Sequence, residues 1–300
     1  MLTRRRALQL IGGTLAMGIG AAGYALGIEP LLRLITTRYT ISPAGWPRGL
    51  KLRIVAIADL HACEPWMPAG RVQRIVEAAN ALEGDMVVLL GDYMTGHRFV
   101  TGPVAPDAWA GALRKLKAPL GVHAILGNHD WWHDEEAQRR RKGPTVARKA
   151  LEAAGIPVYE NDAARLEKDG QGFWLAGLAD QLALFRAGRP RWRGFEGLDD
   201  LPGTLAKVPE GEPVILLAHE PDIFTEVPAR VSLTLSGHTH GGQVRLFGYS
   251  PIVPSSHGNR FAYGHVVEDA RHLIVSGGLG CSIVPVRFGV PPELVVVEVS

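Results

Sequence analysis

Residues 52–61 read LRIVAIADLH, and this stretch decides which class of fold the rest of the chain completes. The run from Leu52 to Ala58 is mostly apolar and does not alternate with polar residues. Strands that are covered on both faces have this pattern. Asp59 and His61 follow at the carboxyl end of the run, where ligands gather in α/β proteins. The stretch therefore predicts a buried strand with a functional site at its end.

Further apolar runs rich in Val, Ile and Leu recur along the chain, and we interpret each as a buried strand: 85–90, 121–126, 213–218 and 231–235. Residues 71–82 (RVQRIVEAANAL) lie between the first two strands and place their apolar side chains at helical spacing. Residues 108–116 and 145–154 also have helical patterns. The first half is therefore predicted to be β-α-β-α-β.

The second half of the sequence predicts hairpins instead. One turns across Lys168–Gly170, the other joins strands at 265–267 and 273–276, and a last strand covers 293–299. Residues 185–201 give no clear pattern and are expected to be a loop. We expect an α/β fold of two packed mixed β-sheets flanked by helices, forming one domain over residues 41–300. Two smaller domains are the alternative.

The composition limits the classes of protein to which this chain can belong. Hydrophobic residues make up 46% of the 300 residues, which is enough for a large core. The net charge of +2 is too small to indicate nucleic-acid binding, and none is expected. The two cysteines, Cys63 and Cys281, exclude a disulfide-rich scaffold and a zinc site made mainly of thiolates. Whether they pair is left open.

The N-terminus has the form of a targeting segment over residues 1–40. Arg4–Arg6 precede an apolar stretch from Ala7 to about Ile28, and Thr-Arg-Arg-x-x-Leu resembles a twin-arginine export signal. The expected partners are the twin-arginine translocase and the membrane. The protein would then be exported or membrane-anchored, facing the periplasm or the cell exterior. An uncleaved anchor that spans the bilayer is the alternative, and the triple arginine disfavours a buried core helix.

A polar cluster follows the end of each predicted central strand. The side chains that could bind metal are Asp59, His61, Asp92, Asn128, His219, His238 and His240. Singly, each could form a turn or cap, but together they meet the criteria for a site. Oxygen and imidazole ligands without thiolate suit manganese, iron, zinc or cobalt. Seven ligands exceed the needs of one catalytic ion and fit two divalent ions that share a carboxylate.

The motifs D-x-H, G-D, G-N-H-D, H and G-H-T-H occur in this order and resemble the calcineurin-like metallophosphoesterases. Residues 241–243 and 276–293 resemble the branch of that family with twin-arginine or membrane-anchored N-termini. The resemblance implies a four-layer sandwich and a first metal held by Asp59, His61 and His240. It implies a second metal on Asn128, His219 and His238, bridged to the first by Asp92. His129 would be the catalytic histidine, oriented by Asp130.

The function implied is hydrolysis of phosphate esters, with phosphodiesters or pyrophosphates favoured and lipid-linked or cell-envelope substrates included. Two ions ~3.5–4 Å apart share a hydroxide that attacks phosphorus, while His129 protonates the leaving group. A non-catalytic metal-binding module on the same fold is the alternative function. His129 could also be a spare ligand or a structural residue.

Several neighbouring residues keep two interpretations at this stage. Trp131 and Trp132 either pack in the core or form a wall of the substrate pocket. Arg139–Lys142 form either a solvated face or a basic patch for anionic lipid or cell-wall polymer. Glu220 and Asp222 either orient His219 from behind or simply form a turn.

Overall fold

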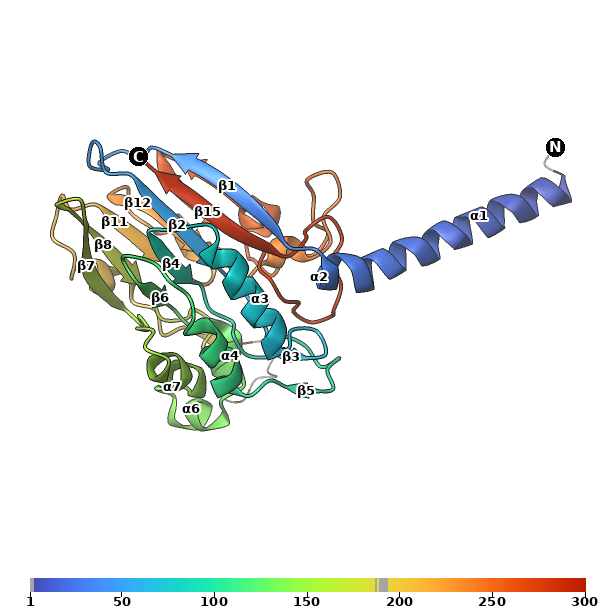
Figure 1. The fold of residues 1–300 in the computed structure, drawn as a ribbon, viewed down its shortest axis with the longest axis horizontal. Helices are drawn as coiled ribbons and strands as arrows, with labels where there is room; N and C mark the ends of the chain where they lie inside the picture. The colour runs from blue at the N-terminus through green and yellow to red at the C-terminus, as the bar shows by residue number, and fades with distance from the viewer. Residues whose placement is uncertain (1–2, 187, 189–193) are drawn as a thin grey trace.

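The apolar runs form the central strands of two β-sheets in the computed structural model, which describes residues 3–186, 188 and 194–300. Figure 1 shows the arrangement of these sheets. The first sheet has five strands, and their order across it is β1 (Ile35–Ile41), β15 (Glu293–Val299), β2 (Leu52–Ile57), β4 (Met86–Leu89) and β6 (Val122–Ala124). Strands β2, β4 and β6 are parallel, whereas β15 runs antiparallel to β2.

The second sheet has six strands, in the order β13 (Gly264–Glu268), β14 (Arg271–Val275), β12 (Val231–Ser236), β11 (Val214–Leu217), β8 (Gln171–Gly177) and β7 (Asp162–Lys168). Its four inner strands are parallel, and the two edge strands run antiparallel to their neighbours. Both sheets are therefore mixed. The α/β class with two mixed sheets is confirmed.

Three apolar cores separate four layers. Side chains from both sheets, such as Ile54 and Leu217, meet in the core between them. The outer face of the first sheet packs against α3 (Ala69–Asn80), α4 (Pro106–Leu113) and α7 (Val146–Ala153) (Figure 1). The outer face of the second sheet packs against α8 (Leu201–Leu205) and η2 (Pro221–Thr225). The helix–sheet–sheet–helix arrangement was predicted, and so was the face that α3 buries, with Val72, Ile75, Val76 and Ala79.

Short elements complete the domain, mostly between the sheets' strands. They are β3 (Cys63–Glu64), β5 (Gly102–Pro103), α5 (Asn128–Trp132), α6 (Glu135–Arg140), β9 (Leu184–Phe185), β10 (Phe195–Glu196), η3 (His240–Gly242) and η4 (Gly258–Phe261). The stretch 185–201 was predicted to be a loop. It contains the last residue of β9 and the whole of β10, which pair with each other. Residues 187 and 189–193 of that stretch lie outside the described residues.

Strand β1 was not predicted from the sequence. It pairs in parallel with β15, from Ile35 beside Glu293 to Ile41 beside Val299, so it crosses the expected boundary at residue 40. Its residues, ITTRYTI, alternate between half-buried and exposed, because only one face of this edge strand is covered by the rest of the protein. Such a strand lacks the continuous apolar run that identified the central strands.

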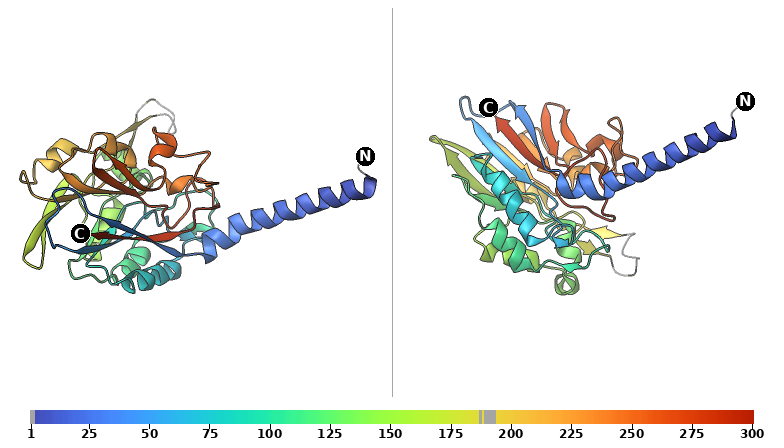
Figure 2. Two further views of the ribbon diagram at one scale, coloured as in Figure 1. Left: turned by 90° about the horizontal axis from the view of Figure 1, so that it is seen from above. Right: turned by 45° about the vertical axis from the view of Figure 1, so that its right-hand side comes forward.

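A long helix projects from the domain, as Figures 1 and 2 show. It consists of α1 (Arg4–Gly23), the π-helical η1 (Tyr24–Ile28) and α2 (Glu29–Leu32). Among the described residues, this 29-residue segment is the one helix long and apolar enough to cross a membrane, a property that signal sequences share. Its apolar side chains are mostly exposed. It is therefore no core helix, in agreement with the prediction.

Candidate metal centre

The seven predicted ligands lie at the carboxyl ends of five parallel strands. In the first sheet, β2 leads to Asp59 and His61, β4 to Asp92, and β6 to Asn128. In the second sheet, β11 leads to His219, and β12 leads to the two histidines of the G-H-T-H motif. All are buried except His238, which is half-buried. The two sheets thus bring side chains from residues 59 to 240 into one place.

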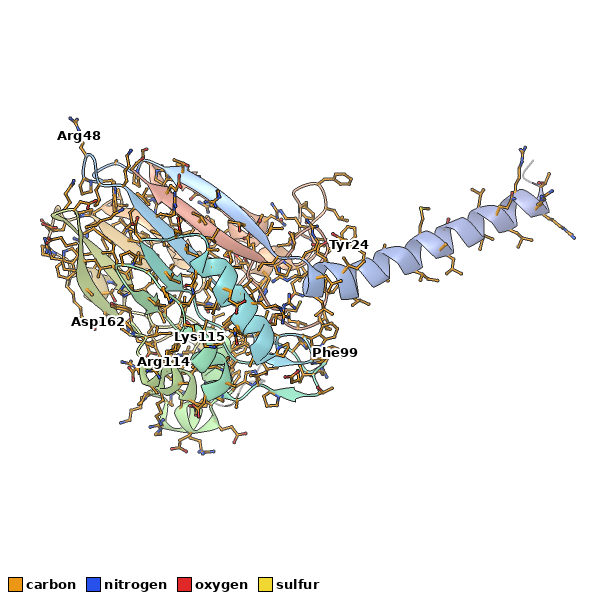
Figure 3. All side chains as sticks on the ribbon, in the orientation of Figure 1. Tyr24, Arg48, Phe99, Arg114, Lys115 and Asp162 are labelled. Atoms are coloured by element: carbon orange, nitrogen blue, oxygen red, sulfur yellow. The ribbon has the colours of Figure 1, made fainter. Side chains whose placement is uncertain are left out.

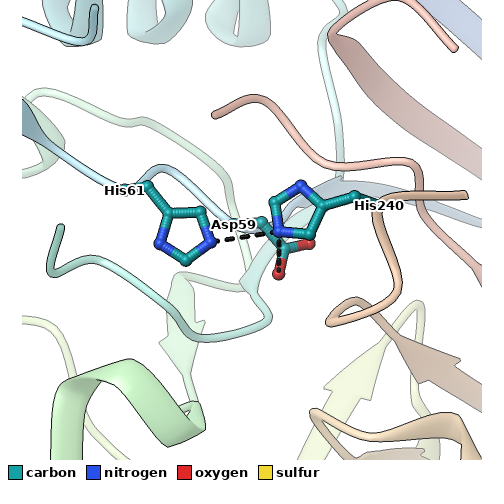
Figure 4. Close-up of side chains that lie close together, drawn as sticks. All are labelled: Asp59, His61 and His240. Carbon is teal, nitrogen blue, oxygen red and sulfur yellow. Dashed lines mark hydrogen bonds and ion pairs between the residues drawn. The ribbon is translucent and has the colours of Figure 1, made fainter. Parts of the chain in front are cut away.

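Asp59, His61 and His240 form the first ligand cluster (Figure 4). The Nε2 atoms of His61 and His240 are 3.0 Å apart, and His240 Nε2 is 3.7 Å from Asp59 Oδ1. The two rings are stacked, with their planes 16° apart. Nitrogen and oxygen atoms from the ends of two strands, β2 and β12, therefore converge on one point.

The second cluster contains Asp92, His219 and His238. Asn128 belongs to it as well, because its Oδ1 lies 2.9 Å from His238 Nδ1. Asp92 Oδ2 is 3.2 Å from His219 Nε2 and 3.5 Å from His61 Nε2. One carboxylate oxygen therefore reaches both clusters, as the bridging role of Asp92 requires.

An unpaired atom of the site tests whether metal ions fit it. Asp59 Oδ2 is buried and has no hydrogen-bond partner among the described residues. Leaving such a group unpaired costs about 1–3 kcal/mol, and a bound cation would satisfy it. Cys63 and Cys281 are buried free thiols that belong to none of the ligand clusters. The donor set thus fits divalent ions bound by oxygen and imidazole nitrogen.

The backbone at the site is held in an unusual conformation. Five of the seven ligands have positive φ angles: Asp59 (54°), His61 (47°), Asp92 (58°), His238 (67°) and His240 (52°). Asp and His adopt this left-handed region more readily than most residues. Strain of this kind concentrates at functional sites, where the surrounding structure fixes it.

The Asp130 carboxylate fixes much of that backbone. It accepts hydrogen bonds from the backbone N–H groups of Asp92, Tyr93, Met94 and Gly127. The loop after β4 and the start of α5 are therefore tied to one buried side chain. None of these bonds involves the ring of His129, so the expected role of Asp130 as the orienting partner of that ring is corrected.

Position 127, in the G-N-H-D motif, requires glycine because neighbouring side chains leave no room for a Cβ atom. A Cβ atom at this position would collide with Asp92 Oδ1 and with the ring of His219. A Cβ at Gly91 would similarly meet the backbone of Gly127 and the His219 ring. The glycines that precede Asp92 and Asn128 thus allow the two strand ends to approach each other.

Partners behind the histidines set their orientation. His61 Nδ1 lies 2.9 Å from the Met94 carbonyl oxygen, and His219 Nδ1 lies 2.6 Å from that of Leu90. These contacts leave Nε2 of both rings available to a metal. The fully buried Arg287 places its Nη2 3.1 Å from His240 Nδ1. Its role was missed, and the only signal for it was the resemblance of residues 276–293 to the family.

Burial tunes the protonation of the ligands. It lowers the pKa of His61 to about 4, so this ring is neutral at pH 7, as metal ligation requires. Burial raises the pKa of Asp59 to about 7. Burial would also raise the pKa of Asp92, but the neighbouring His219 and His129 outweigh it and hold that pKa well below its usual value. Asp92 is therefore the permanently charged centre of the site.

His129 was not among the predicted ligands, but its ring lies with His61 and Asp92 in a further buried group that could hold a metal ion. Its backbone N–H donates to Asp92 Oδ1 at 2.8 Å. Its ring places Nδ1 3.2 Å from the Thr95 carbonyl oxygen and Nε2 3.4 Å from Ser282 Oγ. Burial lowers the pKa of the ring to about 3, so it is neutral in the free protein. Thr95 and Ser282 hold the orientation that was assigned to Asp130.

The structure also bears on the two interpretations that the sequence left for the tryptophans and for the basic run Arg139–Lys142. Trp131 packs in the core, whereas Trp132 lines the cavity beside the site. Arg139 forms exposed ion pairs with Glu135 and Glu136, as expected of a solvated face.

Glu220 and Asp222, which follow His219, differ from each other. Glu220 Oε1 lies 3.9 Å from His238 Nδ1, whereas Asp222 accepts hydrogen bonds from Ser255 and Ser256. Glu220 therefore lies beside the site, and Asp222 ties down a loop. Asp180, which the sequence did not indicate, forms with Glu220 and His219 a further buried group that could hold a metal ion.

The sequence model of calcineurin-like phosphoesterases matches residues 52–242, which carry all the ligands described above. The chain belongs to this family. This metallophosphoesterase is 32% identical to the metallophosphoesterase YkuE of Bacillus subtilis, over 98% of this chain and 96% of YkuE. It is 27% identical to the phosphodiesterase YaeI of Escherichia coli, over 99% of each chain.

A further relative is a transmembrane protein with a metallophosphoesterase domain from Danio rerio, 32% identical over 81% of this chain and 52% of that protein. The predicted superfamily is confirmed, and so is the prediction of an enzyme. The metallophosphoesterase is a hydrolase that acts on phosphoric ester bonds.

Proposed function

We propose that this metallophosphoesterase is a binuclear enzyme that hydrolyses phosphodiesters or pyrophosphates. The observation that carries the proposal is that Asp92 Oδ2 lies within 3.5 Å of both His61 Nε2 and His219 Nε2. Asp59, His61 and His240 would hold one ion, and Asn128, His219 and His238 the other. Two bound ions would supply an acidified water and hold the phosphate oxygens.

The cavity beside the site favours esters with a second substituent on phosphorus. Its described lining contains no lysine or arginine that could balance the second charge of a monoester. Apolar side chains such as Trp132 and Val286 form most of its walls. The name of the relative YaeI, a phosphodiesterase, agrees with this preference. A phosphodiester presents one negative charge to the metal end and an organic group to the walls.

His129 would serve the leaving group. In the reaction, a water oxygen bonds to phosphorus, the bond to the leaving oxygen breaks, and that oxygen takes up a proton. Burial lowers the pKa of His129 in the protein without bound ions. Its backbone N–H donates to Asp92 and the residue lines the cavity, so it is placed to donate a proton to the leaving oxygen.

A substrate panel with controlled metal content tests the proposal. The full chain is stripped of metal, reloaded with Mn²⁺, Fe²⁺, Zn²⁺ or Co²⁺, and assayed on a nitrophenyl diester, a monoester and a pyrophosphate. We expect hydrolysis of the diester or pyrophosphate that depends on about two ions per chain. Binding of two ions without hydrolysis of any ester would instead support the non-catalytic module.

We further propose that the enzyme acts at the outer side of the cytoplasmic membrane after passage through the twin-arginine translocase. Arg4–Arg6 at the start of α1, and the exposed apolar side chains that follow them in this helix, support this localisation. Replacing Arg4, Arg5 and Arg6 with lysine keeps the charge but removes the guanidinium groups. We expect the triple variant to stay inside the cell, with Arg33→Lys as the control. Normal export of the triple variant would contradict the proposed localisation, and it would not bear on the proposed hydrolysis.

A further inference from the structure

A cavity of about 500 Å³ adjoins the metal centre. Asp92, Asn128, His129 and His238 of the centre line it, and Gln243 and Ser282 add further polar groups. The rest of the lining described is dominated by apolar side chains, among them Trp132, Val244, Ile252, Pro254, Ile283 and Val286. A cavity with this lining suits a molecule with a phosphate at one end and a hydrocarbon at the other.

Apolar side chains that face solvent occur in the cavity lining and in the loop next to it. Ile252, Ile283 and Val284 line the cavity, and the loop between the lining residues Val244 and Pro251 exposes Leu246, Phe247 and Tyr249. We call these six residues the apolar rim. Phe247 is fully exposed, Ile252 is 75% exposed and Ile283 is 68% exposed. Exposed apolar groups that gather around a cavity mark a binding surface.

The backbone of the rim is fixed in a strained form. Ile283 has a φ angle of 65°, a region that β-branched residues rarely adopt. Its N–H donates to the Gly96 carbonyl oxygen at 3.1 Å. The Gln243 side chain accepts from Ser282 N at 2.6 Å and donates to Val284 O at 3.0 Å, so it holds both sides of Ile283. The fold thus retains an isoleucine that is directed outward at a conformational cost.

The apolar rim is joined to the base of the N-terminal helix. Arg287 N donates to Ala25 O at 2.9 Å, and the rings of Tyr24 and Phe288 meet edge to face at 5.9 Å. Phe288 in turn pairs with Val244, beside the rim. The loops around residues 244–262 and 280–290 lie beside the base of α1 in Figures 1 and 2. Figure 3 places Tyr24 and the exposed Phe99 at this same end of the domain.

We infer that the apolar rim rests on the lipid bilayer and that the cavity takes the hydrocarbon chain of a membrane-resident phosphodiester. This inference rests on the proposed function, because it places the ester phosphorus at the metal centre. The helix Arg4–Leu32, which is apolar enough to cross a membrane, would hold the rim at the bilayer surface. A lipid chain then enters the cavity without crossing water.

The test is the dependence of hydrolysis on chain length. The full chain, reconstituted in phosphatidylcholine vesicles and loaded with Mn²⁺, is assayed on nitrophenyl alkyl phosphodiesters from methyl to octyl. Each methylene that enters the cavity is expected to raise kcat/KM by roughly threefold to fourfold. The variant Ile252→Asn,Ile283→Asn is expected to lose most of this gain, because asparagine tolerates positive φ but removes the apolar contact.

The control variant is Val267→Asn, which changes an exposed valine on β13 outside the rim. It is expected to keep the full chain-length gain. Equal gains in the wild type and the rim variant would show partition of the esters into the vesicles alone and would overturn the inference. So would wild-type hydrolysis of the methyl ester without any gain. Failure of the metal-loaded wild type to hydrolyse even the methyl ester would instead contradict the proposed function.

Discussion

The metal centre and the apolar cavity share one boundary but are built in different ways. The centre is formed at the ends of strands from both sheets, and nearly all of its side chains are buried. The cavity and its rim are formed mainly by the loops that follow η3 and β14, and several of their side chains face solvent. In the proposed function, the strand ends would supply the chemistry and the loops would select the substrate.

Both regions nevertheless use the same strained backbone conformation. At the metal centre, Asp59 and His238 have φ angles of 54° and 67°. At the rim, Phe247 and Ile283 have φ angles of 50° and 65°. Asp and His tolerate this region through their short polar side chains, whereas isoleucine does not. The comparison suggests that strain directs ligands inward in one region and apolar groups outward in the other.

Removal of the metal is expected to have the largest effect, and it should affect one region only. A chelator that strips the protein should reduce hydrolysis of short and long diesters to background, because both depend on the same ions. The far-ultraviolet circular dichroism should be retained, since the three apolar cores do not contain the ligands. Full activity of the stripped protein without added ions would show that hydrolysis does not depend on the metal centre.

His129→Ala tests the boundary between the two regions. If His129 donates a proton, the variant should keep its metal content and lose ~10²–10⁴-fold in turnover on an alkyl leaving group. The loss should be smaller for nitrophenolate, which needs little protonation. Rates and metal content are measured together, with the half-buried His272→Ala on β14 as the control. Loss of an ion, or an equal loss on both leaving groups, would make His129 a ligand or a phosphate clamp.

Asp130→Asn tests how the rigid region is held. Asparagine keeps one acceptor oxygen, so two of the four backbone N–H groups that Asp130 binds would lose their partner. We expect a loss of about 3 kcal/mol in the free energy of unfolding, measured by urea denaturation, together with weaker metal binding. Asp169→Asn, in the exposed β7–β8 turn, should have little effect. A normal stability with a lowered kcat would restore the catalytic role of Asp130.

Gln243→Ala should have the smallest effect, and it should be confined to the loops. The change removes the two hydrogen bonds that hold Ser282 and Val284. We expect about a 10-fold loss in kcat/KM for long-chain diesters, while the metal content stays at the wild-type value. Loss of metal would show that the two regions are not independent.

The sequence predicted the parts of the fold that have a continuous apolar or helical pattern. The central strands β2, β4, β11 and β12 are covered on both faces, so most of their positions carry apolar side chains that indicated a strand. Strand β1 is an edge strand whose partner β15 lies at the opposite end of the chain. No local pattern could indicate that pairing, because it depends on how the whole sheet closes.

The same distinction applies to the site. The predicted ligands lie directly after strands, and the glycines before them mark the points of close approach, so short motifs identified them. Asp130 was assigned to the wrong partner because adjacency in sequence does not fix the direction of a side chain. Arg287 and Gln243 act through contacts with residues some 40 positions away, at His240 and Ser282. Only the three-dimensional structure brings these residues together.

If Asp92 serves two metal ions at once, its replacement should affect both ions, which a count of bound metal can detect. Mass spectrometry of the intact native protein would count the ions bound to the wild type, Asp92→Ala and His61→Ala. We predict two ions in the wild type, loss of both in Asp92→Ala, and loss of mainly one in His61→Ala. Equal and mild losses in the two variants, or a single ion in the wild type, would contradict the shared carboxylate.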